Sequence, residues 1–211
     1  MDIYYPGINI KVELSVIGEY LNEMENGVNA VCNSYLEREE KENKGIPHYE
    51  YQHIYSIAEQ EIPRIIKMPF VVTLCTLFEN SIFELLKYAQ DKEDKKIGVK
   101  DIRGKTLISS YNKYIQHILE YDFSFNQDAM SDFSKITKVR NCIAHSNGNI
   151  ESMNDSLKKE LNKLIEMDIG LSQTNNQLDV SYDYLLNTYN FVSSSIRELM
   201  EYMEERYFEN T

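Results

Sequence analysis

Apolar residues recur along this 211-residue chain at the three- and four-residue steps that are typical of amphipathic helices. The first series lies within residues 8–44 and keeps heptad register, through Leu14, Ile17, Leu21, Met24, Val28, Val31 and Tyr35. A second series follows Ser181, which we expect to cap a helix that carries Leu185, Tyr189, Val192, Ile196, Leu199 and Met203. These patterns predict a long helix at each end of the chain.

Residues 49–148 predict the core helices. A helical stretch begins near Tyr49, is broken or bent at Pro63 or Pro69, and is most apolar over residues 70–90. A third helix follows Gly104, with Leu107, Ile108, Tyr111, Ile115, Ile118 and Leu119 on its inner side. A fourth begins near 126–128 and ends at Ser146-Asn147-Gly148, which is a good stop signal.

The remaining residues predict a small β element among C-terminal helices that span 152–208. Residues 152–167 form a shorter helix, and the apolar runs 169–171 and 178–180 are expected to pair as a hairpin near 169–180. The expected fold class is therefore all-α, an antiparallel helical bundle with a small hairpin. We expect one domain over residues 1–211, which is long enough to bury a core.

Composition is that of a soluble globular protein, with 42% hydrophobic and 27% charged residues. The N-terminal residues resemble no signal peptide, and the apolar run 68–86 is interrupted by Glu79 and Glu84, so we expect no membrane span. The three cysteines form no metal-ligand spacing and are expected to be buried free thiols. A cytoplasmic protein without a metal or another cofactor is the prediction.

The net charge of −12 argues against a general nucleic-acid coat protein, but the charge is uneven. Residues 91–140 hold 10 Lys and Arg against 8 Asp and Glu, a balance of +2, so the remainder carries −14. The segment without excess acid is the one that leads into Arg140. This distribution allows RNA to approach there, although charge can also simply fluctuate along a chain.

The strongest chemical signal is the string Arg140-Asn141-Cys142-Ile143-Ala144-His145, followed at once by Ser146-Asn147-Gly148. It places a guanidinium, a carboxamide and an imidazole within six residues at a predicted helix end. Together these groups can bind a phosphate, orient a hydroxyl and move a proton near neutral pH. RNA cleavage needs those three abilities.

A helical wheel separates the motif residues. With Ile136 at the centre of the apolar face, Arg140 lies inside the apolar arc and Ala144 lies at its edge. Asn141 and His145 point away from it. A charge in the apolar arc is costly unless it is paired. The best partner is Glu79, a lone carboxylate in the apolar stripe of the second helix, while Glu84 lies on its solvated side. The pair could be a structural salt bridge or part of an anion-binding site.

The string resembles the R-N-x-x-x-H signature of the HEPN superfamily, small all-helical proteins that include many metal-independent ribonucleases of bacterial defence and toxin systems. HEPN proteins often carry an acidic residue on the helix opposite the motif, and Glu79 resembles it. The likeness covers most of the chain in helix order, but only about six residues in sequence.

The resemblance implies a homodimer in which two motif helices face each other, and an endoribonuclease that leaves a cyclic phosphate. Arg140, Asn141 and His145 are then the catalytic residues, with Glu79 supporting them, RNA as substrate and an antitoxin or defence protein as a further partner. Some HEPN toxins carry a modifiable tyrosine two residues after the histidine; here that residue is Asn147. The alternative is a non-catalytic HEPN-like module for dimerisation or for binding a nucleotide or a protein, which the acidity favours.

Overall fold

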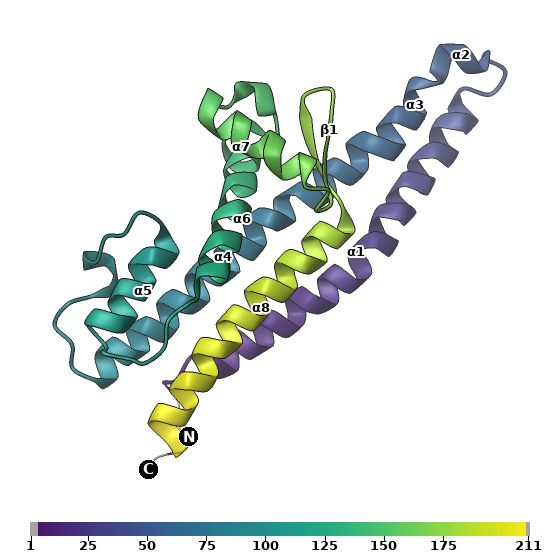
Figure 1. The fold of residues 1–211 in the computed structure, drawn as a ribbon. Coiled ribbons are helices and arrows are strands. Elements are labelled where there is room, and N and C mark those ends of the chain that lie inside the picture. Colours follow the sequence, from purple (N-terminus) through teal and green to yellow (C-terminus); the bar gives the residue numbers. More distant parts are fainter. Residues whose placement is uncertain (1–3, 210–211) are drawn as a thin grey trace. The chain divides into compact units, whose positions relative to one another are not determined.

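The computed structural model describes residues 4–209 and shows an all-α fold with one small β-hairpin, as the sequence predicts (Figure 1). Its longer helices are α1 (Gly7–Glu42), α4 (Ile62–Lys92), α5 (Leu107–His117), α6 (Gln127–Ser146), α7 (Asp155–Glu166) and α8 (Tyr182–Glu204). Shorter turns are α2 (His48–Tyr51), α3 (His53–Ser56), 3₁₀ turns at Val99–Asp101 and Ile150–Ser152, and π-helical turns at Ile57–Glu61 and Glu205–Glu209. Strands β1 (Leu171–Thr174) and β2 (Gln177–Val180) pair antiparallel.

The described chain divides into two compact units. The first unit holds residues 4–16, 73–140 and 187–209, and the second holds residues 17–72 and 141–186. The division falls inside α1, α4, α6 and α8. One domain over residues 1–211 stays a prediction.

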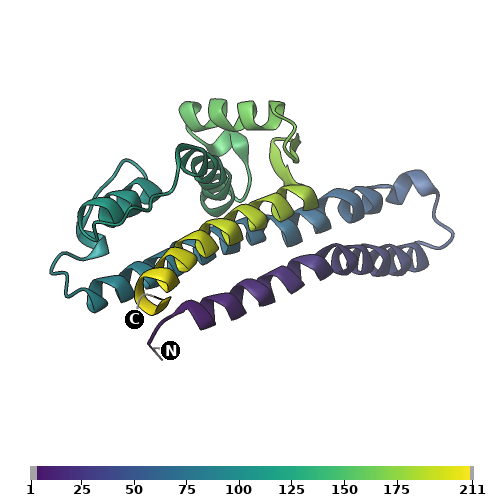
Figure 2. The same ribbon diagram turned by 60° about the horizontal axis from the view of Figure 1, so that its bottom comes forward.

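Aromatic packing forms the centre of the first unit. The Phe78 ring lies 4.4 Å from the Phe133 ring of α6 and stacks on Phe191 of α8. The Tyr189 hydroxyl donates to the Leu14 carbonyl at 2.8 Å and thereby joins α8 to the start of α1 (Figure 2). Because Leu14 and Phe78 are fully buried, this core holds the α4 and α6 segments of the unit in place.

Helix α5 packs on the α4 segment of the first unit. The Thr106 hydroxyl caps α5 by accepting from the Ser109 N–H, the Tyr111 hydroxyl donates to the Glu79 carbonyl at 3.2 Å, and Ile108 and Ile115 are buried. The predicted inner side is therefore confirmed in most of its members. Leu107 is the exception, since this first helical residue is exposed.

In the second unit the irregularity expected near proline lies just before Pro63. The π-helical turn over residues 57–61 leads directly into α4, and α4 then continues through Pro69. A proline has no N–H to donate to the preceding turn, so a wider turn ahead of Pro63 accommodates the loss. The heptad pattern of α1 fails at Val31, which is exposed, because a straight helix drifts away from a 3.5-residue repeat.

The strands of the hairpin are longer, and its turn is shorter, than the apolar runs predict. Leu171 pairs with Val180 and Thr174 with Gln177, which leaves Asn175 and Asn176 as a two-residue turn, both with positive φ. The Leu178 N–H donates to the Gly148 carbonyl at 2.9 Å, so the hairpin holds the segment that follows α6. Ser181 caps α8 through the Tyr184 N–H, as predicted.

Within the described residues, the helical stretch His48–Lys92 is long and apolar enough to cross a membrane by length and composition. Half of its most apolar window is buried inside the protein, a property of core helices. Residues 68–86, for which the sequence predicts no membrane span, lie within this stretch, so length and composition do not support that prediction.

Candidate functional site

Helix α6 carries the whole motif on its last two turns. Asn126 caps its start by accepting from the Ala129 N–H at 2.8 Å, and the helix ends at Ser146, close to both predicted bounds. The boundary between the units follows Arg140, so Asn141 and His145 belong to the second unit.

In the first unit Arg140 interacts electrostatically with Glu79 of α4. Burial raises the pKa of the Glu79 carboxyl, and the positive charge of Arg140 acts in the opposite direction. Both residues are half-buried, and the Nε atom of Arg140 is buried. The predicted partners thus influence each other, while a direct hydrogen bond between them stays a prediction.

Two further residues belong to this cluster. Burial raises the pKa of the Cys75 thiol to about 12. The negative charge of Glu79 adds to this rise, and the positive charge of Arg140 opposes it. Burial and the Glu79 charge also raise the pKa of the Tyr111 hydroxyl. We call Arg140, Glu79, Cys75 and Tyr111 the Arg140 cluster. The sequence predicts Tyr111 on the inner side of its helix and Cys75 as a buried thiol. A helical wheel treats each helix alone, so it cannot show that both residues lie near Glu79.

In the second unit the end of α6 is closed by an unusual turn. The Cys142 carbonyl accepts two hydrogen bonds, from the Ser146 hydroxyl at 2.6 Å and from the Gly148 N–H at 3.2 Å. Asn147 and Gly148 both have positive φ, of 51° and 79°. A Cβ at residue 148 would lie 2.8 Å from the Met68 sulfur, and any other residue would be strained at this φ, so the turn favours glycine there. The turn after His145 is therefore fixed.

His145 is exposed on the last turn of α6, and Asn141, one turn earlier, is half-buried. Residues four apart on a helix lie on the same face, so the carboxamide and the imidazole are neighbours along α6. Ala144 is exposed as well. The wheel placed Ala144 at the edge of the core face, which is wrong, because residues this close to a helix end have no neighbouring turn to cover them.

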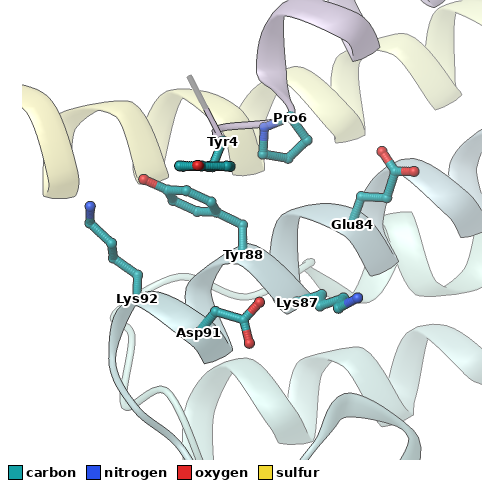
Figure 3. Close-up of a pocket in the computed structure, with 7 residues that line it drawn as sticks. All are labelled: Tyr4, Pro6, Glu84, Lys87, Tyr88, Asp91 and Lys92. Atoms are coloured by element: carbon teal, nitrogen blue, oxygen red, sulfur yellow. The ribbon is translucent and has the colours of Figure 1, made fainter. Parts of the chain in front are cut away.

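A separate hollow in the first unit has a volume of about 480 Å³ (Figure 3). Its lining combines aromatic rings with both signs of charge and consists of Tyr4, Pro6, Glu84, Lys87, Tyr88, Asp91 and Lys92. The predicted solvated position of Glu84 is confirmed, since this side chain is exposed. None of the motif residues lines the hollow.

Among residues 4–209, no group of three or more His, Cys, Asp and Glu side chains could hold a metal ion. Cys75 and Cys142 are buried free thiols, and Cys32 is partly exposed. Burial raises the pKa of Cys142, against the effect of its hydrogen bond with Ser146. A thiol with a raised pKa is a poor nucleophile at neutral pH, so neither buried cysteine is a candidate catalytic residue.

Comparison with protein-family models, with curated proteins and with solved structures gave no match for this chain.

Proposed function

We propose that this protein is a metal-independent endoribonuclease of HEPN type whose chemistry is carried by Arg140, Asn141 and His145. The observation that carries the proposal is the exposed imidazole of His145, on the same helix as Arg140 and directly before a turn that two hydrogen bonds close. An accessible imidazole on a backbone that is held in this way suits proton transfer near neutral pH.

In the proposed reaction, a His145 imidazole removes the proton from a ribose 2′-hydroxyl. The 2′-oxygen then forms a bond to the adjacent phosphorus, and the bond from phosphorus to the 5′-oxygen of the next nucleotide breaks. A second imidazole, or water, protonates that leaving oxygen, which gives a 2′,3′-cyclic phosphate and a free 5′-hydroxyl. Arg140 stabilises the negative charge that builds on the phosphoryl oxygens, and Asn141 orients the imidazole or the phosphate.

We further propose a two-fold symmetric homodimer in which the ends of two α6 helices face each other. A single helix end is a shallow site that excludes little water, and a second copy would add another imidazole and another guanidinium. Exposed Ala144 and His145 at the end of α6 support this surface.

A cysteine cross-link tests the dimer. In a background in which the partly exposed Cys32 is replaced by Ser, Ala144→Cys should give a covalent dimer with a short bis-maleimide at micromolar protein. The control Ala30→Cys places a thiol at an exposed position on α1 and should not. Light scattering that reports only monomer, or equal cross-linking of both variants, would rule the arrangement out.

Cleavage of RNA in excess EDTA tests the proposed activity. Purified protein should release fragments with cyclic phosphate and 5′-hydroxyl ends, identified by mass spectrometry. His145→Ala should lose most of this activity, whereas His117→Ala, which removes another exposed imidazole, should keep it. Cleavage that requires added Mg²⁺, or that persists at full rate without His145, would refute the mechanism. No cleavage by the purified protein would favour the non-catalytic binding module.

We also propose that this activity acts in a bacterial toxin or defence system, as the resemblance to HEPN proteins suggests. Expression of the wild-type chain in bacteria should then arrest growth, and expression of His145→Ala should not. Equal growth of the two strains, with both proteins present at the same level, would contradict a toxic role.

A further inference from the structure

One short segment of the first unit carries an excess of positive charge. Residues 96–113 carry five cationic side chains and one acidic residue, a balance of +4, whereas the rest of the chain holds 17 basic and 33 acidic residues, a balance of −16. The five cations are Lys96, Lys100, Arg103, Lys105 and Lys113, and all five are exposed. We call this set the α5 basic surface. So strong a local reversal of charge, in a protein this acidic, needs an explanation.

These cations are not neutralised by the protein itself. Within residues 4–209, none of the five forms an ion pair with a carboxylate. The one acid of the segment, Asp101, instead accepts a hydrogen bond from the Gly98 N–H at 2.8 Å and so holds the 3₁₀ turn. The Lys113 ammonium donates to the Arg103 carbonyl, which leaves its charge uncompensated.

The backbone that carries the cations is held firmly against α5. The Tyr114 hydroxyl donates to the Ile97 carbonyl at 3.0 Å, and the Gly104 N–H donates to the Ser110 hydroxyl at 2.8 Å. A Cβ on Gly104 would lie 2.6 Å from the Ser110 nitrogen, so this loop lies too close to α5 for any other residue. The backbone of this loop therefore loses little freedom when a ligand binds, and only the side chains must become ordered, which favours a binding role.

We propose that the α5 basic surface binds the phosphodiester backbone of single-stranded RNA, at a site separate from the motif residues of α6. The proposal rests on the proposed function for its ligand and adds where the substrate chain is held. Exposed lysines are depleted in protein–protein interfaces and common in phosphate contacts, so the composition favours a nucleic-acid backbone over a protein partner. In an acidic protein such a surface would offset the repulsion of RNA by the remainder of the chain.

Salt dependence gives a quantitative test. Each phosphate contact on single-stranded nucleic acid makes the slope of log K, the association constant, against log salt more negative by about 0.7. The triple variant Lys96→Gln/Arg103→Gln/Lys105→Gln should therefore make that slope less negative by about 2 and weaken binding by about 10–100-fold at 0.1 M salt. Lys100 and Lys113 are left unchanged, because the Lys100 ammonium lies 4.8 Å from the centre of the Phe83 ring and the Lys113 ammonium donates to the loop. Binding of a fluorescent oligoribonucleotide is measured on the His145→Ala background, so that cleavage cannot interfere.

The matched control is Lys41→Gln/Lys44→Gln/Lys163→Gln, which removes three exposed charges from the second unit. Its salt slope and affinity should stay close to those of the parent. Equal losses of affinity in both triple variants would show that only net charge matters. No RNA binding by the parent would show that RNA is not the ligand. Either result overturns the proposal. So would a triple that weakens self-association and leaves RNA binding intact, because the surface would then hold a second acidic copy.

Cleavage is measured separately, so that the two proposals can fail independently. With His145 present, the Gln triple should cleave a dinucleotide, which is too short to reach a second site, at the wild-type rate, and cleave a long RNA more slowly. Binding that depends on the three cations in a protein without ribonuclease activity supports the RNA surface and refutes the proposed function. Ribonuclease activity in a protein whose RNA binding does not depend on these cations supports the proposed function and refutes the RNA surface.

Discussion

Arg140 and His145 are five residues apart on one helix, yet their surroundings differ. Arg140 is half-buried and interacts with the Glu79 carboxylate, whose pKa burial raises. His145 is exposed at the end of α6, before a turn held by the hairpin segment. The same short motif therefore contains Arg140, which interacts with the core of its unit, and His145, which is exposed to solvent. Substitution of Arg140 should therefore lower stability, whereas substitution of His145 should not, because a buried charge pair contributes more to stability than an exposed charge.

The largest expected effect is that of His145→Ala on the rate of RNA cleavage. Loss of a general acid–base residue should lower the rate by about 10²–10⁴-fold, while the free energy of unfolding changes by less than about 0.5 kcal/mol, as for most exposed positions. Single-turnover cleavage and urea unfolding measure the two quantities. A variant that loses activity and stability together would erase the difference between His145 and Arg140.

Arg140→Ala should lower stability as well as activity. Removing one member of a half-buried charge pair leaves the other less compensated, at a cost of about 1–3 kcal/mol, below the value for a fully buried pair. Urea unfolding at neutral pH measures the cost. The matched variant Arg140→Lys keeps the charge and should recover much of the stability but little of the activity, because only the guanidinium can hold a phosphate at two points.

The Arg140→Ala cost should also depend on pH in a defined direction. Burial raises the pKa of Glu79 above its ordinary value of 4.5, and Arg140 limits this rise, so the variant should raise it further. A raised folded-state pKa means that the folded protein prefers the protonated acid. Its favourable contribution is complete below the unfolded-state pKa and is lost as pH rises through the folded-state pKa.

The stability difference between wild type and Arg140→Ala should therefore widen as pH rises from about 4 through the Glu79 transition, on the scale of ordinary carboxyl pKa values. The double variant Arg140→Ala/Glu79→Gln removes the titrating group and should flatten the curve. A difference that stays constant with pH in the single variant would show that Arg140 contributes only packing.

The contrast between the two residues was partly legible in the sequence. The wheel placed Arg140 in the apolar arc and His145 outside it, and α6 begins and ends near the predicted residues. Periodicity also predicted the capped last helix and the hairpin. It failed where an element ends or drifts, as at Leu107, Val31 and Ala144, because exposure there depends on which neighbouring turns exist.

What periodicity could not supply is contact between elements. Nothing in the spacing of Tyr111 or Cys75 indicates that both are close enough to feel the Glu79 charge. The positive-φ turn over Asn147 and Gly148 was visible only as a stop signal, since its contact with Met68 joins residues 80 positions apart in the chain. The excess of positive charge over residues 96–113 is not apparent in the balance over residues 91–140, because neighbouring acids offset it.

Gly148→Ala tests whether the turn after His145 matters as a fixed support. A left-handed φ of 79° strains any other residue, and the new Cβ would press on the Met68 sulfur, for a combined cost of about 1–2 kcal/mol. Activity should fall too, if the position of His145 depends on this turn. The control Gly27→Ala lies in α1 with open space around its Cβ and should be neutral or stabilising by up to about 1 kcal/mol. Equal melting temperatures for the two variants would contradict the assigned role.

The smallest expected effect is that of Tyr111→Phe in the Arg140 cluster. The variant removes one hydroxyl that donates to the Glu79 carbonyl at 3.2 Å, and a single neutral hydrogen bond contributes about 0.5–1.5 kcal/mol. The ring stays and keeps α5 packed on α4, so cleavage should change by less than about threefold if Tyr111 acts only through the fold. Tyr189→Phe is the control, because it removes a similar bond to the Leu14 carbonyl, which belongs to neither the Arg140 cluster nor the α5 basic surface. A large loss of cleavage in Tyr111→Phe at unchanged stability, absent in Tyr189→Phe, would indicate that Tyr111 takes part in the reaction itself.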